Sequence, residues 1–156
     1  MKKWLTVIIV ITSLMMPTVS TAASSTEKQT TYFNFAGTNS KGVYVKADYI
    51  QWFRGERANK EAYKDKACYW DRGKCYAMDD YYIRNVNPKI RTLPVAKNAV
   101  ITMVTYQIEK TYDIKKQKIS LSTFKKEMKK PRFRDIPFHI ELKNGTIIKI
   151  TEQYIP

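Results

Sequence analysis

The single histidine of the chain, His139, is the first residue to consider for catalytic chemistry. Nucleophilic and general acid–base catalysis commonly use histidine, because its charge changes near neutral pH. His139 alternates with Phe138 and Ile140 in a strand-like segment, and the chain contains no Gly-x-Ser-x-Gly nucleophile motif. We therefore interpret His139 as a surface residue of a strand, and we expect no catalytic residue.

The sequence contains no clear motif for binding a metal ion or a cofactor. The carboxylates of Asp79 and Asp80 are adjacent, and neighbouring side chains of an extended segment point to opposite faces. A turn before the following strand explains this pair more simply than cation binding does. The five glycines do not form a phosphate-binding loop, and no spaced calcium-loop motif is present. The sequence predicts no metal site and no cofactor.

The two cysteines, Cys68 and Cys75, are separated by six residues. An even number of cysteines at short spacing in an exported chain predicts a disulfide bond. A zinc site would need further Cys or His residues nearby, and a redox pair usually has only two residues between its cysteines.

The segment from Tyr81 to Val95 combines arginine, asparagine and proline, and it is the most unusual part of the chain. Planar arginine donors beside adaptable amides are typical of a surface that faces a ligand. A structural interpretation stays open, in which the asparagines satisfy turn backbone and the arginines clamp a neighbouring carboxylate or the C-terminus. The candidate binding residues are Trp52, Tyr82, Arg84, Asn85, Asn87 and Arg91.

The net charge of the chain is +14, and the predicted leader contributes two of these charges, which leaves +12. Between Lys110 and Arg134 there are ten basic residues against Asp113 and Glu127. Such a surface attracts anionic cell-wall or membrane polymers. In the alternative interpretation, the lysines only keep a secreted protein soluble. Nucleic acid is a less favoured partner, because most aromatic residues lie at 44–82, away from the basic run. The candidate basic surface consists of Lys115, Lys116, Lys118, Lys125, Lys126, Lys129, Lys130 and Arg132.

The first residues have the layout of a secretory signal peptide. Lys2 and Lys3 precede an apolar run of 13 residues, which Pro17 and small residues follow. This run is shorter than the roughly 20 residues that a transmembrane helix needs. We expect residues 1–22 to be a signal peptide, and the mature chain to be secreted without a transmembrane segment, with cell-envelope association as an option. Residues 23–30 are an expected flexible lead-in, and 31–156 a single domain.

Apolar alternation and β-branched residues predict strands at 32–37, 43–50, 81–86, 90–95 and 100–108, the fourth interrupted by Pro94. Helices are expected at 56–66, with Ala58 and Ala62 on its packed face, and at 123–129, capped by Ser122 or Thr123. A closing hairpin is expected at 138–150. Its predicted three-residue loop pairs Ile140 with Ile148 and Phe138 with Ile150, and leaves His139, Glu141 and Lys149 on the other face.

These elements predict an α+β fold. We expect a mostly antiparallel, strongly bent sheet or small open β-barrel of about six strands with one or two short helices. The order of the elements is compatible with an oligonucleotide- or oligosaccharide-binding type of barrel, by analogy of architecture alone.

Three stretches resemble a group of small exported bacterial proteins, many of them lipoproteins, that are functionally uncharacterised. They are Asp48–Ala58, with its Gly-Glu-x-Ala helix start; Tyr81–Val95, of the type YYIRNxNPKxRTLPV; and Phe138–Leu142 with the ending G-x-I-x-x-I-x-E-Q-Y-x-P. The resemblance covers roughly a third of the mature chain and implies a small β-rich fold outside the cell. This chain departs from the group in lacking a lipid-attachment cysteine and in its basic region near 110–130. The resemblance implies no activity.

The expected function is that of a secreted, non-catalytic module that binds a protein or peptide partner through the Tyr81–Val95 segment. The first alternative is a cationic module that adheres to anionic cell-wall or membrane polymers. The second alternative is a hydrolase with an unrecognised site, for which His139 would be the best residue.

Overall fold

The computed structural model describes residues 25–87 and 89–155. The predicted signal peptide, residues 1–22, lies outside this part of the chain.

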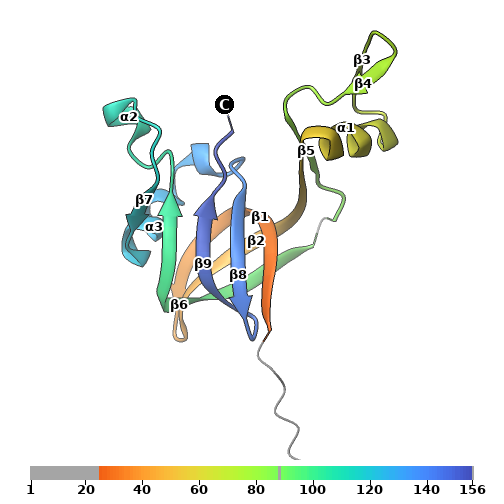
Figure 1. Ribbon diagram of the computed structural model, residues 1–156. Coiled ribbons are helices and arrows are strands. Elements are labelled where there is room, and N and C mark those ends of the chain that lie inside the picture. The colour runs from red at the N-terminus through yellow and green to blue at the C-terminus, as the bar shows by residue number, and fades with distance from the viewer. Residues whose placement is uncertain (1–24, 88, 156) are drawn as a thin grey trace, which may run out of the picture.

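Five strands close into a small mixed β-barrel (Figure 1). They are β1 (Thr26–Asn39), β2 (Gly42–Arg54), β6 (Ile90–Met103), β8 (Phe138–Lys143) and β9 (Thr146–Glu152). Strand β1 pairs with β2 and β8, β8 pairs with β9, β9 pairs with β6, and β6 pairs with β2, which completes the ring. Within the described residues, the β6–β9 pair is parallel and the other barrel pairs are antiparallel. The predicted mostly antiparallel small barrel is confirmed, and it is closed rather than open.

The connectivity is compatible with the oligonucleotide- and oligosaccharide-binding type of barrel, by analogy of architecture alone. Counted along the chain, the barrel strands neighbour one another in the order first, second, third, fifth, fourth and again first, with the third and fifth parallel. Helix α3 (Leu121–Glu127) lies between the third and fourth strands. This agreement concerns architecture and carries no function with it.

Strand β1 begins earlier than the sequence suggests. Residues 26–30, expected to be part of a flexible lead-in, belong to this strand and pair with β8. Strand β6 is also longer, because the separate strands predicted at 90–95 and 100–108 form one strand that ends at Met103. Pro94 is at the end of the pairing with β2, and pairing with β9 starts at Val95. The missing N–H of Pro94 is therefore tolerated where the strand changes neighbours.

Shorter elements decorate the barrel. Strand β5 (Tyr81–Arg84) extends the sheet beside β2, and β7 (Gln117–Ile119) pairs with the end of β6. Helix α2 (Ile108–Thr111) follows β6, and a 3₁₀ turn at Pro131–Phe133 precedes β8. Helix α1 (Gly55–Lys64) and the hairpin of β3 (Tyr69–Asp71) and β4 (Lys74–Tyr76) stand away from the barrel (Figure 1).

The second predicted helix, expected at 123–129, starts and ends two residues earlier, as α3. Its N-cap is Ser120 rather than Ser122 or Thr123, and the Oγ of Ser120 accepts a hydrogen bond from the amide of Thr123 at 3.1 Å. Phe124 and Met128 share a buried face, as their four-residue spacing predicts. The core inside the barrel includes the ring of Phe124 packed against Phe33 and Phe138.

The turn of the closing hairpin has two residues, so the predicted three-residue loop is wrong. Asn144 and Gly145 both have positive φ, 51° and 73°, and Lys143 pairs with Thr146 across them. Two residues with positive φ form the type I′ turn that suits the twist of a hairpin, and asparagine and glycine are the residues that adopt it readily.

The register of this hairpin is set by a β-bulge beyond the turn. Ile148 is the extra residue, so Ile140 pairs with Ile150 and Phe138 pairs with Glu152, and both predicted pairs are wrong. The bulge returns the apolar residues of both strands to the barrel interior after the two-residue turn. The predicted outer face is confirmed, since Lys149 and Glu141 form an ion pair of 2.9 Å there.

Candidate functional site

Residues 55–80, which we call the lobe, are inserted between barrel strands β2 and β6 and project from one end of the barrel (Figure 1). Helix α1 begins directly after β2 and buries Ala58 and Ala62, as its predicted apolar stripe requires. These alanines pack with Phe53 and Ala77 in a small second core. Because alanine side chains are small, helix α1 can pack closely against Phe53 at the end of β2 and against Ala77.

The disulfide Cys68–Cys75 closes the tip of the lobe, which confirms the predicted bond. Trp70 pairs with Cys75 across the β3–β4 hairpin, and Arg72 and Gly73 turn the chain with positive φ of 45° and 78°. A covalent closure of so short a loop removes conformations from the unfolded chain and braces the hairpin. The tip is therefore a pre-organised surface.

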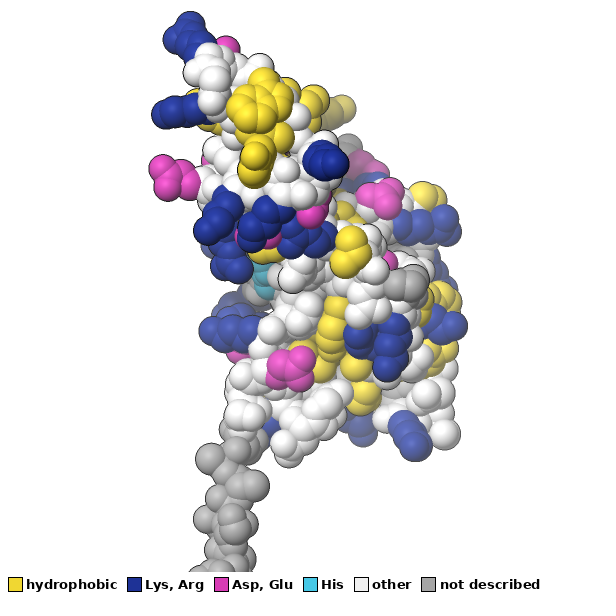
Figure 2. Space-filling view, turned by 90° about the vertical axis from the view of Figure 1, so that its right-hand side faces the viewer, with side chains coloured by type: hydrophobic (Ala, Val, Ile, Leu, Met, Phe, Trp, Pro, Cys, Tyr) yellow, Lys and Arg dark blue, Asp and Glu magenta, His cyan; other side chains and the backbone are white. Residues whose placement is uncertain are grey.

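Aromatic rings are exposed on this tip and on the adjoining end of helix α1, which carries Tyr63. The exposed fractions of Tyr63, Tyr69 and Trp70 are 58%, 48% and 66%. The rings of Tyr63 and Trp70 meet edge to face with centroids 6.1 Å apart, and Tyr69 packs beside Tyr76 at 5.8 Å. The two strands of the β3–β4 hairpin have only three residues each, and no other described element covers them. The rings of Tyr69 and Trp70 on this hairpin therefore face solvent. Figure 2 shows hydrophobic side chains gathered on the lobe with lysine and arginine side chains around them.

Two adjoining hollows share the rings of Tyr63 and Trp70. One hollow has a volume of about 390 Å³ and is also lined by Lys64 and Lys66. The other has a volume of about 550 Å³, and its lining includes Lys60, Lys74, Glu56 and Tyr76. Exposed aromatic patches rimmed by charged residues mark interaction sites on soluble proteins. We take this aromatic surface of the lobe as the candidate functional site.

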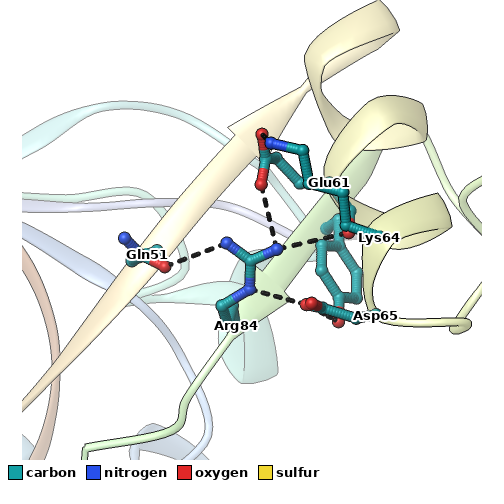
Figure 3. Close-up of polar contacts among 6 residues, drawn as sticks. Gln51, Glu61, Lys64, Asp65 and Arg84 are labelled. Atoms are coloured by element: carbon teal, nitrogen blue, oxygen red, sulfur yellow. Dashed lines mark hydrogen bonds and ion pairs between the residues drawn. The ribbon is translucent and has the colours of Figure 1, made fainter.

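Arg84, predicted as a ligand-facing residue, holds the lobe to the barrel (Figure 3). Its Nε donates to Asp65 Oδ2 at 2.6 Å, and its Nη2 donates to Glu61 Oε2 at 2.9 Å. Its Nη1 donates to Gln51 on β2 at 3.3 Å, and the hydroxyl of Tyr82 donates to Asp65 at 2.8 Å. The two carboxylates raise the pKa of the Arg84 guanidinium, Asp65 more than Glu61. This is the clamp of the structural interpretation.

Acid is expected to loosen the lobe. Hydrogen bonds from Lys64 and then Arg84 hold the pKa of Glu61 below its ordinary 4.5, and hydrogen bonds from Arg84 and then Tyr82 hold that of Asp65 below 3.8. Groups whose pKa is lowered by folding stabilise the fold above their unfolded pKa, and this stabilisation is lost as the pH falls through the folded value. The contribution is therefore complete above about pH 5 and decreases as the pH falls below the ordinary pKa values, until it is gone below the lowered pKa values of the folded state.

Amide hydrogen exchange tests this expectation, with rates corrected for intrinsic pH dependence. Protection of helix α1 should fall on acidification while that of β8 changes less, and the difference should shrink in Arg84→Gln. Equal acid sensitivity of the Arg84→Gln variant and the wild-type chain would contradict the role of the clamp.

The remaining predicted binding residues do not gather into one patch. Asn85 donates to Asp48 Oδ2 at 2.8 Å, and the side-chain oxygen of Asn87 accepts from the amide of Lys89 at 3.1 Å. The guanidinium of Arg91 stacks 4.1 Å from the ring centre of Tyr49. Arg84, Asn87 and Arg91 do line a shallow hollow of about 260 Å³.

Trp52 belongs to a different hollow of about 310 Å³, with Arg54, Tyr81 and Gln153 in its lining. Its ring stacks on Tyr81 with centroids 4.7 Å apart and meets the edge of His139. Both ring nitrogens of His139 are within hydrogen-bond distance of a partner, Thr30 Oγ1 at 3.0 Å and Gln153 Oε1 at 3.1 Å. His139 thus lies on the outer face of β8, as its alternation with apolar residues predicts.

The basic surface divides into paired and unpaired side chains. Lys130 pairs with Glu127 at 2.7 Å and Arg132 with Glu109 at 3.3 Å, and Lys115 pairs with Asp113 at 3.0 Å. The Nζ of Lys125 donates to Thr38. The other four form no ion pair with any described residue: Lys116, Lys118, Lys126 and Lys129.

The described residues contain no group of three or more His, Cys, Asp or Glu side chains that could hold a metal ion. Across the same part of the chain, no helix has the length and hydropathy needed to cross a membrane.

The exposed rings of Tyr63, Tyr69 and Trp70 are not among the binding residues that the sequence predicts, most of which belong to the arginine-rich segment Tyr81–Val95. A signal was present, because Tyr69 and Trp70 lie inside a short disulfide loop that cannot bury them. Comparison of the chain with protein-family models, curated proteins and solved structures gives no match.

Proposed function

We propose that this protein is an exported, non-catalytic binding module whose contact surface is the aromatic surface of the lobe. The observation that carries the proposal is the 66% exposure of Trp70 on a hairpin braced by a disulfide, next to the 58% exposed ring of Tyr63 on helix α1. A rigid aromatic side chain contributes a large contact area at a small cost in conformational entropy. The predicted signal peptide and the resemblance to exported bacterial proteins support a location outside the cell.

Arg84 of the arginine-rich segment is already hydrogen-bonded within the fold. This favours the lobe over the arginine-rich segment as the contact surface. All three nitrogen atoms of the Arg84 guanidinium already donate hydrogen bonds, to Asp65, Glu61 and Gln51. A ligand that used Arg84 would have to displace these carboxylates, which are partly shielded from water. The exposed rings of the tip need no such rearrangement.

A second candidate is adhesion to anionic cell-wall or membrane polymers through the basic surface. The observation that favours it is the set of lysines without an ion pair among the described residues, Lys116, Lys118, Lys126 and Lys129. Such binding is dominated by long-range charge attraction and weakens steeply with salt.

Binding of the exported chain to envelope fractions of a producing culture separates the two candidates. The mature chain is expected to start at Ala23 or Ser24. Its binding should survive about 0.5 M salt, where the Debye length is only a few Å. The double variant Tyr63→Ala/Trp70→Ala should lose roughly tenfold or more in affinity, while Phe35→Ala, a half-exposed ring on β1, should bind normally.

A variant with glutamine at the four unpaired lysines should keep its salt-resistant binding. If instead this variant loses binding and the aromatic double variant keeps it, the second candidate is correct. Retention of full binding by both variants would overturn both candidates.

A further inference from the structure

A second projection, distinct from the lobe, exposes apolar side chains near basic residues. It is the loop that follows helix α2, where Tyr112 is 88% exposed and Ile114 is 47% exposed. Tyr112 has a left-handed backbone, with φ of 53°, which ends the helix. Lys110, Lys115 and Lys116 lie within four residues of Tyr112 in the chain, and Lys115 pairs with Asp113.

The exposed apolar residues of this protein are concentrated on the two projections. Ten large hydrophobic side chains are exposed in the described part of the chain, and six of them lie on the lobe or on the α2 loop. These six are Tyr63, Tyr69, Trp70, Met78, Tyr112 and Ile114. A random scatter of surface hydrophobics needs no explanation, but such a concentration does.

Both projections point toward the same end of the barrel. In Figure 1, α2 and the β3–β4 hairpin rise on either side of the C-terminal segment, and β1 starts at the opposite end. The two apolar tips are therefore separated from each other but directed alike. A groove-bound chain would need a continuous track between them, whereas a flat surface can contact both at once.

The lobe as a whole, residues 55–80, has six basic and six acidic side chains, but lysines outnumber carboxylates where the exposed rings lie. Around Tyr112, Asp113 is the single acidic residue between Lys110 and Lys116. The hollows beside Trp70 are lined by Lys60, Lys64, Lys66 and Lys74 against the single carboxylate of Glu56. Tryptophan and tyrosine prefer the level of lipid headgroups, and a lysine near an anionic bilayer contributes about 1 kcal/mol of attraction. Aromatic rings between lysines thus complement an anionic lipid surface in both shape and charge.

We propose that the lobe tip and the α2 loop dock together on the surface of an anionic lipid bilayer. Trp70, Tyr112 and Ile114 enter the headgroup region, and the lysines contact the headgroups. This inference rests on the proposed function, because it uses the same aromatic surface of the lobe, and it adds both the second contact and the partner. The protein lies on the bilayer and does not span it.

Flotation with vesicles of phosphatidylcholine mixed with phosphatidylglycerol tests the inference, with vesicles of phosphatidylcholine alone for comparison. The mature chain should float with the mixed vesicles and bind the neutral ones less. Trp70 is the strongly exposed tryptophan of the described residues, whereas Trp52 is stacked on Tyr81, so a blue shift of fluorescence on binding should be absent in Trp70→Phe. Removing either anchor should lower the affinity roughly tenfold.

The variants for this test are Trp70→Ala and Tyr112→Asn, because asparagine tolerates the left-handed backbone of Tyr112. Phe35→Ala is the matched control and should bind like the wild-type chain. Binding to phosphatidylglycerol vesicles that requires Trp70 but not Tyr112 would overturn the two-point docking.

Other outcomes separate this inference from the proposed function. Trp70-dependent binding to cell-wall fractions without vesicle binding would overturn the lipid surface and leave the proposed function standing. Vesicle binding that depends only on the four unpaired lysines would overturn both, as would binding that ignores Trp70 in every fraction.

Discussion

Replacing Phe138 with alanine is expected to lower the free energy of unfolding by about 3–5 kcal/mol. The ring of Phe138 is fully buried inside the barrel, with centroids 5.0 Å from Phe33 and 6.1 Å from Phe124. Its loss leaves a cavity between β8, β1 and α3 that the closed barrel cannot collapse to fill. Domains of this size are stable by only about 5–15 kcal/mol, so the change takes a large share of the total.

Urea denaturation followed by circular dichroism measures this loss. Phe35→Ala removes the same atoms from a ring that is 45% exposed on the outside of β1, and its cost should be about 1 kcal/mol. Similar costs for the two substitutions would contradict the position of Phe138 at the centre of the core.

The second large effect is expected at Glu152, a carboxylate with only 3% of its surface exposed. It accepts hydrogen bonds from the amides of Val104 and Thr105, at 2.6 and 3.1 Å, and from the hydroxyl of Thr105. These donors lie where the chain leaves β6. In Glu152→Ala both amides are buried without a partner, and each costs about 1–3 kcal/mol, so the expected loss is roughly 2–5 kcal/mol.

Glu152→Gln should cost less than Glu152→Ala, because the amide group keeps one acceptor oxygen for these donors. Hydrogen exchange of the Val104 and Thr105 amides reports the local effect, and urea denaturation the global one. Because Glu152 secures the start of the segment that carries Tyr112, Glu152→Ala should also weaken the contact of the α2 loop with vesicles. Unchanged exchange at Val104 and Thr105 would show that other groups hold this turn.

Local patterns along the chain already predict much of the fold. The β-branched run at 43–50 and the alternation at 138–142 indicate β2 and β8, and the stripe of Ala58 and Ala62 indicates α1. The disulfide also follows from the sequence, because two cysteines have one possible pairing. These features depend on residues close together in the chain, where the period of the pattern decides which face is buried.

The hairpin register shows where local patterns stop. Asn144-Gly145 indicates a two-residue turn, but that turn by itself places apolar residues on both faces. The predicted three-residue loop would remove this conflict by lengthening the turn, whereas the structure keeps the two-residue turn and inserts a bulge at Ile148. Either solution returns Ile140 to the interior. Strand β9 also pairs with β6, a contact with no counterpart in the local sequence, so local patterns do not distinguish the two solutions.

The role of each polar or aromatic side chain depends in the same way on distant partners. Arg84 meets its carboxylates 19 and 23 residues away, where α1 packs beside β5, and an arginine used as a clamp has the same sequence signature as one that binds a ligand. Trp70 is hydrophobic, yet no second layer of the fold covers its hairpin. Composition and short-range periodicity therefore specify the helices, the strands and the disulfide. Long-range packing decides which side chains are bonded inside the fold and which remain exposed to a partner.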